Sequence, residues 1–368
     1  MNKERLLKTF LQLVQIDSES GHEKAVAGYI VTRLDSLGIS YEIDDVGGEI
    51  GSDTGNIVSR MEGTMPGSIA LSAHMDTVIP GNGVNPIIED GIIRSDGTTI
   101  LGADDKSGIA AILETLEYYK DKPHPTIEAV FDVQEELGLR GASHMQMDRV
   151  KSDFTVVLDT NGKPGIIIIA APHMKVQRVN ISGKASHAGI APEKGISAIR
   201  SASIAISRMN LGRIDKDTTS NVGTIEGGKS FNIIPDSCSF QFEVRSVNED
   251  SYNKHIKHII SEVERACRET GTTYTLETVN YLKGFIFSPE DELPSLLAQS
   301  AKEAGINPSF EASGGGSVGN VFNAGGKTAV VISTGMTNPH GLDEYIEVKH
   351  LEQTAEWIIK LVGKIGGR

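Results

Sequence analysis

The sequence predicts an α/β protein with a mixed, mostly parallel sheet, interrupted by an inserted ferredoxin-like α+β domain. Apolar strand patterns at residues 68–74, 126–133 and 154–159 alternate with a helix pattern at 107–119, which is typical of a parallel sheet. From about residue 174 the order of the patterns becomes strand, helix, strand, strand, helix, strand. That order is the ferredoxin-like one. The change in the order of strand and helix patterns therefore predicts the inserted domain.

The first domain is expected to begin with two helices and to end with one. Five apolar residues repeat on one face of the first helix: Leu6, Leu7, Phe10, Leu11 and Val14. A second helix is predicted at 23–37, where Gly38 supplies a stop. After the insertion we expect a helix at 293–304, a buried strand at 328–333 and a closing helix at 349–362.

The inserted domain is predicted to contain four strands and two helices. The strands are expected at 175–182, 220–226, 237–246 and 273–279, and the helices at 195–209 and 250–270. Residues 1–173 and 284–368 would then form one domain, and residues 174–283 the inserted one.

Composition excludes some partners and indicates a compartment. The 368 residues carry a formal net charge of −14, which argues against nucleic acid or an anionic membrane as a partner. The N-terminal helix pattern is interrupted by charges, so it is neither a signal sequence nor a membrane span. The two cysteines, Cys238 and Cys267, form no disulfide framework, and we expect a cytoplasmic protein.

Histidine and acidic side chains follow three of the predicted strands. His74 and Asp76 end the first of them, and positions i and i+2 of a strand face the same side. The pair Glu135-Glu136 ends the second strand. Asp159 ends the third. A solvated polar turn explains any one of these by itself, but the carboxyl ends of such strands are also where ligands of α/β sheets collect.

Two turns bring further candidates. Asp104 and Asp105 stand between a glycine and an apolar helix, and helix capping explains one of the two carboxylates but not both. His340 lies in a Pro/Gly turn shortly after the strand at 328–333. Imidazole and carboxylate ligands without thiolate are typical of hydrolytic zinc, manganese or cobalt centres. The surplus of carboxylates favours two divalent metal ions that share a bridging carboxylate.

A family resemblance rests on seven motifs in order along the chain. These are HMDTV, GADDKSG, QEELG, VLDTNG, SGKASHAG, NIIPD and PHG. Together they resemble the M20 metallopeptidase family, most closely its peptidase T-like branch. The resemblance implies a phosphorylase/hydrolase-like catalytic domain with an inserted lid. It also implies metal-dependent hydrolysis of amide bonds in short peptides, as in aminopeptidases or tripeptidases. An N-acyl amino acid deacylase on the same scaffold is the alternative.

The resemblance implies a role for each residue of the centre. Asp104 would bridge the two metals, and its bond to Asp105 is typically cis in the family. Glu135 would be the general base and Asp76 would orient His74. The metal ligands are expected to be His74, Asp104, Glu136, Asp159 and His340, and zinc is expected, with manganese or cobalt as alternatives.

The resemblance also implies roles in the lid. His187 matches a lid histidine that stabilises an oxyanion, often from a partner subunit, and the lid would support a homodimer. Asn232 and Arg245 would hold a substrate carboxylate, and Gly315 would let the backbone approach the substrate.

Two other motifs indicate rival functions. Residues 223–230, GTIEGGKS, fit the phosphate-loop pattern, but a strand pattern rather than a helix follows, which favours a hairpin turn. Residues 315–319, GGSVG, fit the nucleophile elbow of a serine hydrolase, with Ser317 as nucleophile and Asp343 and His350 in the right order. We expect a poor strand before Ser317 and no helix after it, which leaves a serine hydrolase as a remote alternative.

Overall fold

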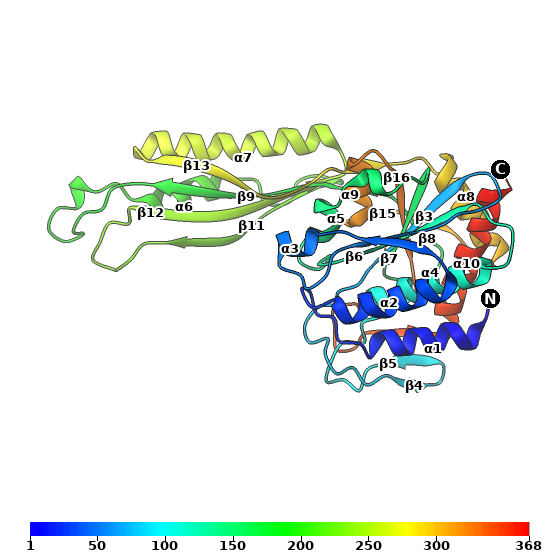
Figure 1. Ribbon diagram of the computed structural model, residues 1–368. Helices are drawn as coiled ribbons and strands as arrows, with labels where there is room; N and C mark the ends of the chain where they lie inside the picture. Colours follow the sequence, from blue (N-terminus) through cyan, green and yellow to red (C-terminus); the bar gives the residue numbers. More distant parts are fainter. Residues whose placement is uncertain (368) are drawn as a thin grey trace. The chain divides into compact units, whose positions relative to one another are not determined.

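The computed structural model describes residues 1–367 and divides the chain into two compact units (Figure 1). The larger unit comprises Met1–Ile169, Phe287–Ala312 and Ser317–Arg368, and the smaller unit comprises Ala170–Ile286 and Ser313–Gly316. The smaller unit is therefore inserted in the sequence of the larger one, and the short segment Ser313–Gly316 also belongs to it.

The larger unit is built on a mixed sheet whose four central strands are parallel. These strands, in spatial order, are β6 (Thr126–Asp132), β3 (Ser68–His74), β7 (Phe154–Thr160) and β16 (Thr328–Ser333). Antiparallel strands flank them: β1 (Ser40–Ile43) and β2 (Ile57–Met61) on one side, β8 (Ile166–Ala171) on the other. All seven residues of β6 are buried, as a central strand covered on both faces requires.

Helices cover this sheet. Figure 1 shows α1 (Lys3–Val14), α2 (Lys24–Leu37), α4 (Ala103–Tyr119) and α10 (Val348–Gly366) gathered on one side. Trp357 of α10 is fully buried, and its indole N–H donates to the carbonyl oxygen of Leu297 in α8 (Glu292–Glu303). The remaining short helices of this unit are α3 (Val46–Ile50), α5 (Arg140–His144) and α9 (Val318–Ala324).

A small second sheet of the larger unit was not predicted. It runs β17 (Met336–Thr337), β18 (Tyr345–Glu347), β5 (Ile92–Arg94) and β4 (Ile87–Glu89), all antiparallel. Its strands have two or three residues, which is too short for an alternation of apolar and polar residues to be recognised.

The smaller unit has the predicted ferredoxin-like order. Its elements are β9 (His173–Ser182), α6 (Ala198–Arg208), β11 (Thr218–Gly227), β12 (Ser237–Ser246), α7 (Glu249–Thr270) and β13 (Thr273–Leu282), with the added short strands β10 (Gly212–Arg213) and β14 (Phe285–Ile286). The sheet order is β10-β11-β12-β9-β13. Helix α7 runs along this sheet in Figure 1, begins where Asn248 accepts the N–H of Ser251, and ends at Gly271 in the left-handed conformation.

The segment around Ser317 corrects one expectation. Strand β15 (Ser309–Ala312) pairs with β8, and helix α9 begins directly after Ser317. The Ser317 hydroxyl and the Asn320 side chain form a capping box, which compensates for the glycine-rich composition of the segment. The prediction that no helix follows Ser317 is therefore wrong.

The other rival motif behaves as predicted. Residues 223–230 run from strand β11 into the turn before β12, so the next element after Ser230 is a strand and not a helix. Lys229, at the position of a phosphate-loop lysine, lies 3.2 Å from the carboxylate of Asp236 instead.

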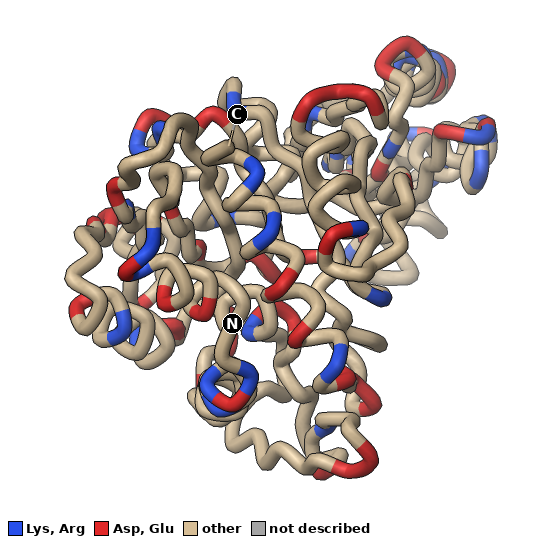
Figure 2. The backbone as a smooth tube through the Cα atoms, turned by 90° about the vertical axis from the view of Figure 1, so that its right-hand side faces the viewer, with Lys and Arg blue, Asp and Glu red and all other residues tan. Residues whose placement is uncertain are grey.

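Charged residues of both signs are interspersed along the chain. In Figure 2, Lys and Arg alternate with Asp and Glu over the helices and loops, and no long basic run is visible in this view. None of the helices in residues 1–367 combines the length and apolarity that a bilayer crossing requires.

Candidate metal centre

Three neighbouring parallel strands deliver the first group of side chains. His74 is the last residue of β3, Glu135 and Glu136 follow β6, and Asp159 lies near the end of β7. Since β6, β3 and β7 are adjacent and parallel, their carboxyl ends meet at one edge of the sheet.

Asp104 lies between two histidines. Its Oδ1 is 3.0 Å from Nε2 of His74, and its Oδ2 is 3.3 Å from Nε2 of His340. The peptide bond between Asp104 and Asp105 is cis, as the resemblance implies. Each oxygen of one buried carboxylate therefore faces a different imidazole, which is the arrangement expected of a ligand that bridges two ions.

The other predicted ligands surround this core. Nε2 of His340 lies 2.9 Å from Oε1 of Glu136, and Nε2 of His74 lies 3.9 Å from Oδ1 of Asp159. Three groups of possible ligand atoms each lie within 4.8 Å of one another: His74, Glu135 and Glu136; His74, Asp105 and Asp159; and Asp104, Glu136 and His340. The structure thus brings together all five predicted metal ligands and the predicted base.

Asp105 is the carboxylate that helix capping explains. Its Oδ1 accepts the backbone N–H of Gly108, three residues on, at the start of the regular part of α4. Asp104 and Asp105 themselves have non-helical backbone angles. Capping therefore accounts for one oxygen of Asp105, whereas its Oδ2 is buried without a hydrogen-bond partner.

Asp76 holds the loop that carries the two glutamates. Its carboxylate accepts the N–H of Glu135 at 2.9 Å, the N–H of Glu136 at 3.2 Å and the hydroxyl of Ser20 at 2.6 Å. Nδ1 of His74 is 3.4 Å from the Asp76 carboxylate and 2.9 Å from the Asp76 backbone oxygen. Asp76 thus lies behind both the first histidine and the glutamate pair.

The electrostatics of the centre divide its groups into two sets. Burial raises the pKa of Asp104, but His340 and His74 lower it more strongly. The carboxylates of Asp104 and Glu136 in turn favour the charged form of His340, and they raise the pKa of His340 to about 10. Burial lowers, but Asp104 and Asp76 more strongly raise, the pKa of His74.

The remaining acids repel one another. Burial, together with Glu136 and Asp104, raises the pKa of Glu135 to about 8. Burial raises the pKa of Asp159, and the neighbouring carboxylates raise it further. Several buried carboxylates close to one another create an excess of negative charge, which divalent cations would neutralise.

The donor set fits divalent metal ions. It consists of imidazole nitrogens and carboxylate oxygens without sulfur. Oε1 of Glu136 is buried and forms no hydrogen bond, although Nε2 of His340 lies 2.9 Å away. A buried carboxylate oxygen with no donor is rare unless a cation or water completes it.

Three buried acids near the centre were missed by the sequence analysis. Glu344 accepts three backbone N–H groups beside Asp104, and Glu23 accepts the N–H of Gln134, the residue before the glutamate pair. Asp132 ends β6 with both carboxylate oxygens buried and without a donor, and burial raises the pKa of Asp132 to about 7. Neither their spacing nor their sequence neighbours distinguish them from surface acids.

The predicted substrate residues lie in the smaller unit. His187 pairs as an isolated bridge with Ile233, and the carbonyl oxygen of Asn232 accepts the N–H of Ala188, so His187 and Asn232 are neighbours. Arg245 forms two hydrogen bonds to Glu243 and donates a third to the carbonyl oxygen of Gly314. Arg245 is therefore beside the segment that contains Gly315, but its guanidinium is already bound to a carboxylate.

The candidate serine triad is not assembled. Oγ of Ser317 accepts the N–H of Gly319 as a helix cap, and Asp343 accepts from Asn338. Nε2 of His350 lies 3.8 Å from Glu347. Each member of the candidate triad thus has another partner.

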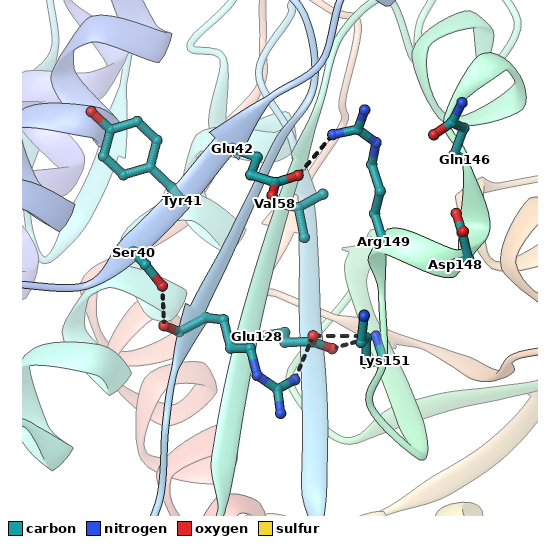
Figure 3. A pocket seen from close by; sticks show the side chains of 10 residues that line it. Ser40, Tyr41, Glu42, Val58, Glu128, Gln146, Asp148, Arg149 and Lys151 are labelled. Atoms are coloured by element: carbon teal, nitrogen blue, oxygen red, sulfur yellow. Dashed lines mark hydrogen bonds and ion pairs between the residues drawn. The ribbon is translucent and has the colours of Figure 1, made fainter.

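A hollow of about 470 Å³ lies in the larger unit, between the edge strand β1 and the 3-10 helix Met147–Arg149 (Figure 3). Arg149 pairs with Glu42 across it, and Arg60 pairs with Glu128. Two of its three cations are therefore neutralised by its own acids, and none of the residues of the metal centre lines it.

Comparisons with known proteins show similarity to peptidases. A model of the M20 peptidase dimerisation domain matches residues 174–271, and a model of peptidase family M28 matches residues 56–189. The uncharacterised protein YqjE of Bacillus subtilis is 38% identical over 365 residues, 98% of each chain. The aminopeptidase PepT of Bacillus cereus is 38% identical, with 99% of each chain covered and a TM-score of 0.92. A tripeptidase of Staphylococcus aureus is 35% identical over both whole chains, with a TM-score of 0.92.

The fold, the acidic centre and these similarities define the class of the protein: it is a metallopeptidase of the M20 family. Within that family, its similarity is to the peptidase T-like branch. The predicted fold class and the predicted family are both confirmed.

Proposed function

We propose that the protein hydrolyses amide bonds of short peptides at a centre of two divalent metal ions, with Asp104 as the bridging ligand. His74 and Asp159 would complete one metal position, and Glu136 and His340 the other. The observation that carries the proposal is the placement of the two Asp104 oxygens, 3.0 and 3.3 Å from two different histidines. Zinc is the proposed metal, because neutral imidazoles and carboxylates suit it, with manganese and cobalt as alternatives.

Glu135 is the proposed general base. When bound, the metal ions would polarise the scissile carbonyl and lower the pKa of a water molecule, so that the water loses a proton readily as it attacks the carbonyl carbon. Glu135 takes a proton from the attacking water and returns it to the leaving amine. Asp76 fixes the backbone of Glu135 and Glu136, so it supports the base and a ligand at once.

The similarity to an aminopeptidase and a tripeptidase supports short peptides as substrates. N-acyl amino acids are the alternative, because the same centre would cleave their amide bond.

We further propose that His187 stabilises the oxyanion and that Asn232, Arg245 and Gly315 bind the substrate. For Arg245 this requires that a substrate carboxylate compete with Glu243 for the guanidinium.

Features of the smaller unit support two further proposals, a homodimer and a cytoplasmic location. Its match to a peptidase dimerisation domain supports a homodimer formed through residues 174–271. Its two cysteines, Cys238 and Cys267, are both buried and free, which supports the reducing environment of the cytoplasm.

The test is a panel of di- and tripeptides and N-acyl amino acids, assayed with the metal-loaded protein, the chelated protein and the Glu135→Gln variant. We expect the peptides to be cleaved, chelation to remove the activity and added divalent metal to restore it. Glu135→Gln is expected to lower kcat by at least 100-fold while both ions remain bound, because general-base catalysis contributes about 10²–10⁴-fold. The Glu89→Gln variant, which changes an exposed glutamate of β4 outside the centre, is the matched control for a lost glutamate charge.

Undiminished turnover in Glu135→Gln would exclude Glu135 as the base. Activity that persists after the ions are shown to have left would refute the metal mechanism itself. Cleavage of N-acyl amino acids but of no peptide would replace the proposed substrate class by its alternative.

A further inference from the structure

The buried carboxylate of Glu344 ends at the backbone of the loop that carries Asp104. Its Oε2 accepts the N–H of Leu101 at 2.8 Å and the N–H of Gly102 at 2.7 Å. Its Oε1 accepts the N–H of Asp104 at 3.0 Å. The Glu344 side chain is fully buried, so water does not compete for these contacts.

These three N–H groups lie before the regular part of α4, where a helix leaves its first donors without an internal partner. Gly102 has a φ of 73°, a left-handed conformation that turns the chain toward Asp104. Without the Glu344 side chain, three donors in a buried loop would lack their acceptor, which is costly for each of them. Glu344 therefore acts as the acceptor that defines this loop.

Glu344 is equally fixed at its own backbone. Its N–H donates to the carbonyl oxygen of Gly341, and the N–H of Gly341 donates to that of Asn338, which closes the turn containing His340. Strand β18 begins at the next residue and pairs with β5 and β17. One side chain thus joins the turn of His340 to the loop of Asp104, segments more than 230 residues apart in the sequence.

Lys106, two residues after Asp104, is almost fully buried, and its side-chain nitrogen donates to the carbonyl oxygen of Ile16. Its interaction with Glu344 is a further contact between Glu344 and this segment.

We propose that Glu344 is a positioning residue that sets the distance between Asp104 and His340, and so preforms the metal position shared by these two ligands. The inference rests on the proposed function, since it assumes that both residues bind metal. Glu344 uses both of its oxygens on backbone donors, so it acts through Asp104 and His340 and not on the substrate.

The test compares Glu344→Gln with Glu347→Gln, which removes a half-exposed carboxylate three residues further along the chain, in strand β18. A glutamine keeps the length of the side chain but replaces one acceptor oxygen with a donor group, so at least one N–H of the Asp104 loop loses its partner. Metal-free samples are titrated with Zn²⁺ in a calorimeter, and amide hydrogen exchange is followed in the peptide that contains Leu101, Gly102 and Asp104.

We expect Glu344→Gln to weaken the binding of one Zn²⁺ ion by about 10–100-fold, the range for residues that orient metal ligands, and to leave the other ion less affected. Exchange of the Leu101–Asp104 amides should rise in the metal-free variant. Excess Zn²⁺ should restore most of kcat, with KM unchanged. Glu347→Gln should match the wild-type protein in all of these measurements.

Two outcomes would overturn the inference: two wild-type affinities in Glu344→Gln, or rapid exchange of the three amides in the wild-type protein itself. The second measurement needs no variant, so it decides the question even if Glu344→Gln fails to fold. If the wild-type protein binds no metal, the proposed function fails instead, and the two failures are distinct.

Discussion

Gly108 shows how closely the chain is packed behind the metal centre. A Cβ atom at this position would lie 2.5 Å from Oδ1 of Asp105 and 2.8 Å from the carbonyl oxygen of Leu158. The first atom belongs to the cap of α4, and the second belongs to the residue before Asp159. Only glycine therefore allows α4 to approach β7 at the distance that the structure has.

The Gly108→Ala variant is expected to lose about 1–3 kcal/mol of unfolding free energy, because overpacking forces the helix away from the strand. Metal binding should weaken as well, since the shift displaces Asp104 or Asp159. The control is Gly28→Ala in α2, where a Cβ would meet nothing within 4 Å. This control should be neutral or stabilising by up to about 1 kcal/mol, because alanine is the better helix former. Urea unfolding and metal titration of both variants measure the two effects, and a neutral Gly108→Ala would contradict the close packing.

At the scale of elements, apolar runs predicted the central strands well. The strands at 68–74, 237–246 and 328–333 have the predicted bounds in the structure, because each is a run of buried or alternating residues with clear ends. The two- and three-residue strands of the small sheet have no such pattern, and only tertiary pairing defines them. Helix α9 was missed because its sequence is rich in glycine and asparagine, whereas its stability depends on the capping box at Ser317.

The contact between α1 and α4 depends on one buried carboxylate. Glu114 of α4 accepts two hydrogen bonds from the guanidinium of Arg5 and one from the backbone N–H of Asn2. The Glu114 side chain is 1% exposed, so its charge has little compensation from water. Arg5 and Asn2 thus secure the N-terminal helix to the core.

We expect Arg5→Ala to lower the unfolding free energy by roughly 1–3 kcal/mol, because it leaves the Glu114 carboxylate buried without its cation. Lys3→Ala should change it by less than about 1 kcal/mol, since Lys3 pairs with Glu352 at the exposed surface. Denaturant unfolding of the two variants gives the comparison. Equal effects of Arg5→Ala and Lys3→Ala would mean that the buried ion pair contributes nothing specific.

At the scale of the whole molecule, two buried histidines are expected to oppose folding in acid. Burial lowers the pKa of His255 in α7, and the nearby His258 lowers it further; burial also lowers the pKa of His350 in α10. A histidine whose folded pKa is lowered adds no pH dependence above its unfolded pKa of about 6.5. Below that pH the unfolded state takes up the proton first, so the unfolding free energy falls until the folded pKa is passed.

Unfolding of the metal-free protein between pH 7.5 and pH 5 checks this sign. The unfolding free energy of the wild-type protein minus that of His255→Gln should decrease as the pH falls below about 6.5. This difference separates His255 from the buried acids Glu135 and Asp132, whose raised pKa values act in the opposite direction. A difference that stays constant or rises on acidification would contradict the assignment. Lys257→Gln, on the same helix, serves as the control for a change of side chain that leaves both histidines in place.

The centre itself could be predicted only in part. The sequence predicted which acids and histidines follow strands, and the family resemblance predicted their roles. The distances required the fold, because the ligands are scattered from His74 to His340 and meet through the parallel order of β6, β3 and β7. The supporting acids Glu344 and Glu23 could not be predicted, since their importance lies in backbone donors of distant loops.

The most direct test of the account is the number of divalent ions bound per chain, measured by elemental analysis after equilibrium dialysis against Zn²⁺. We predict two ions for the wild-type protein, fewer than two for His74→Ala and for His340→Ala, and the greatest loss for Asp104→Ala, which removes the ligand of both positions. Two ions in Asp104→Ala, or none in the wild-type protein, would contradict the central claim that one aspartate bridges a dinuclear centre.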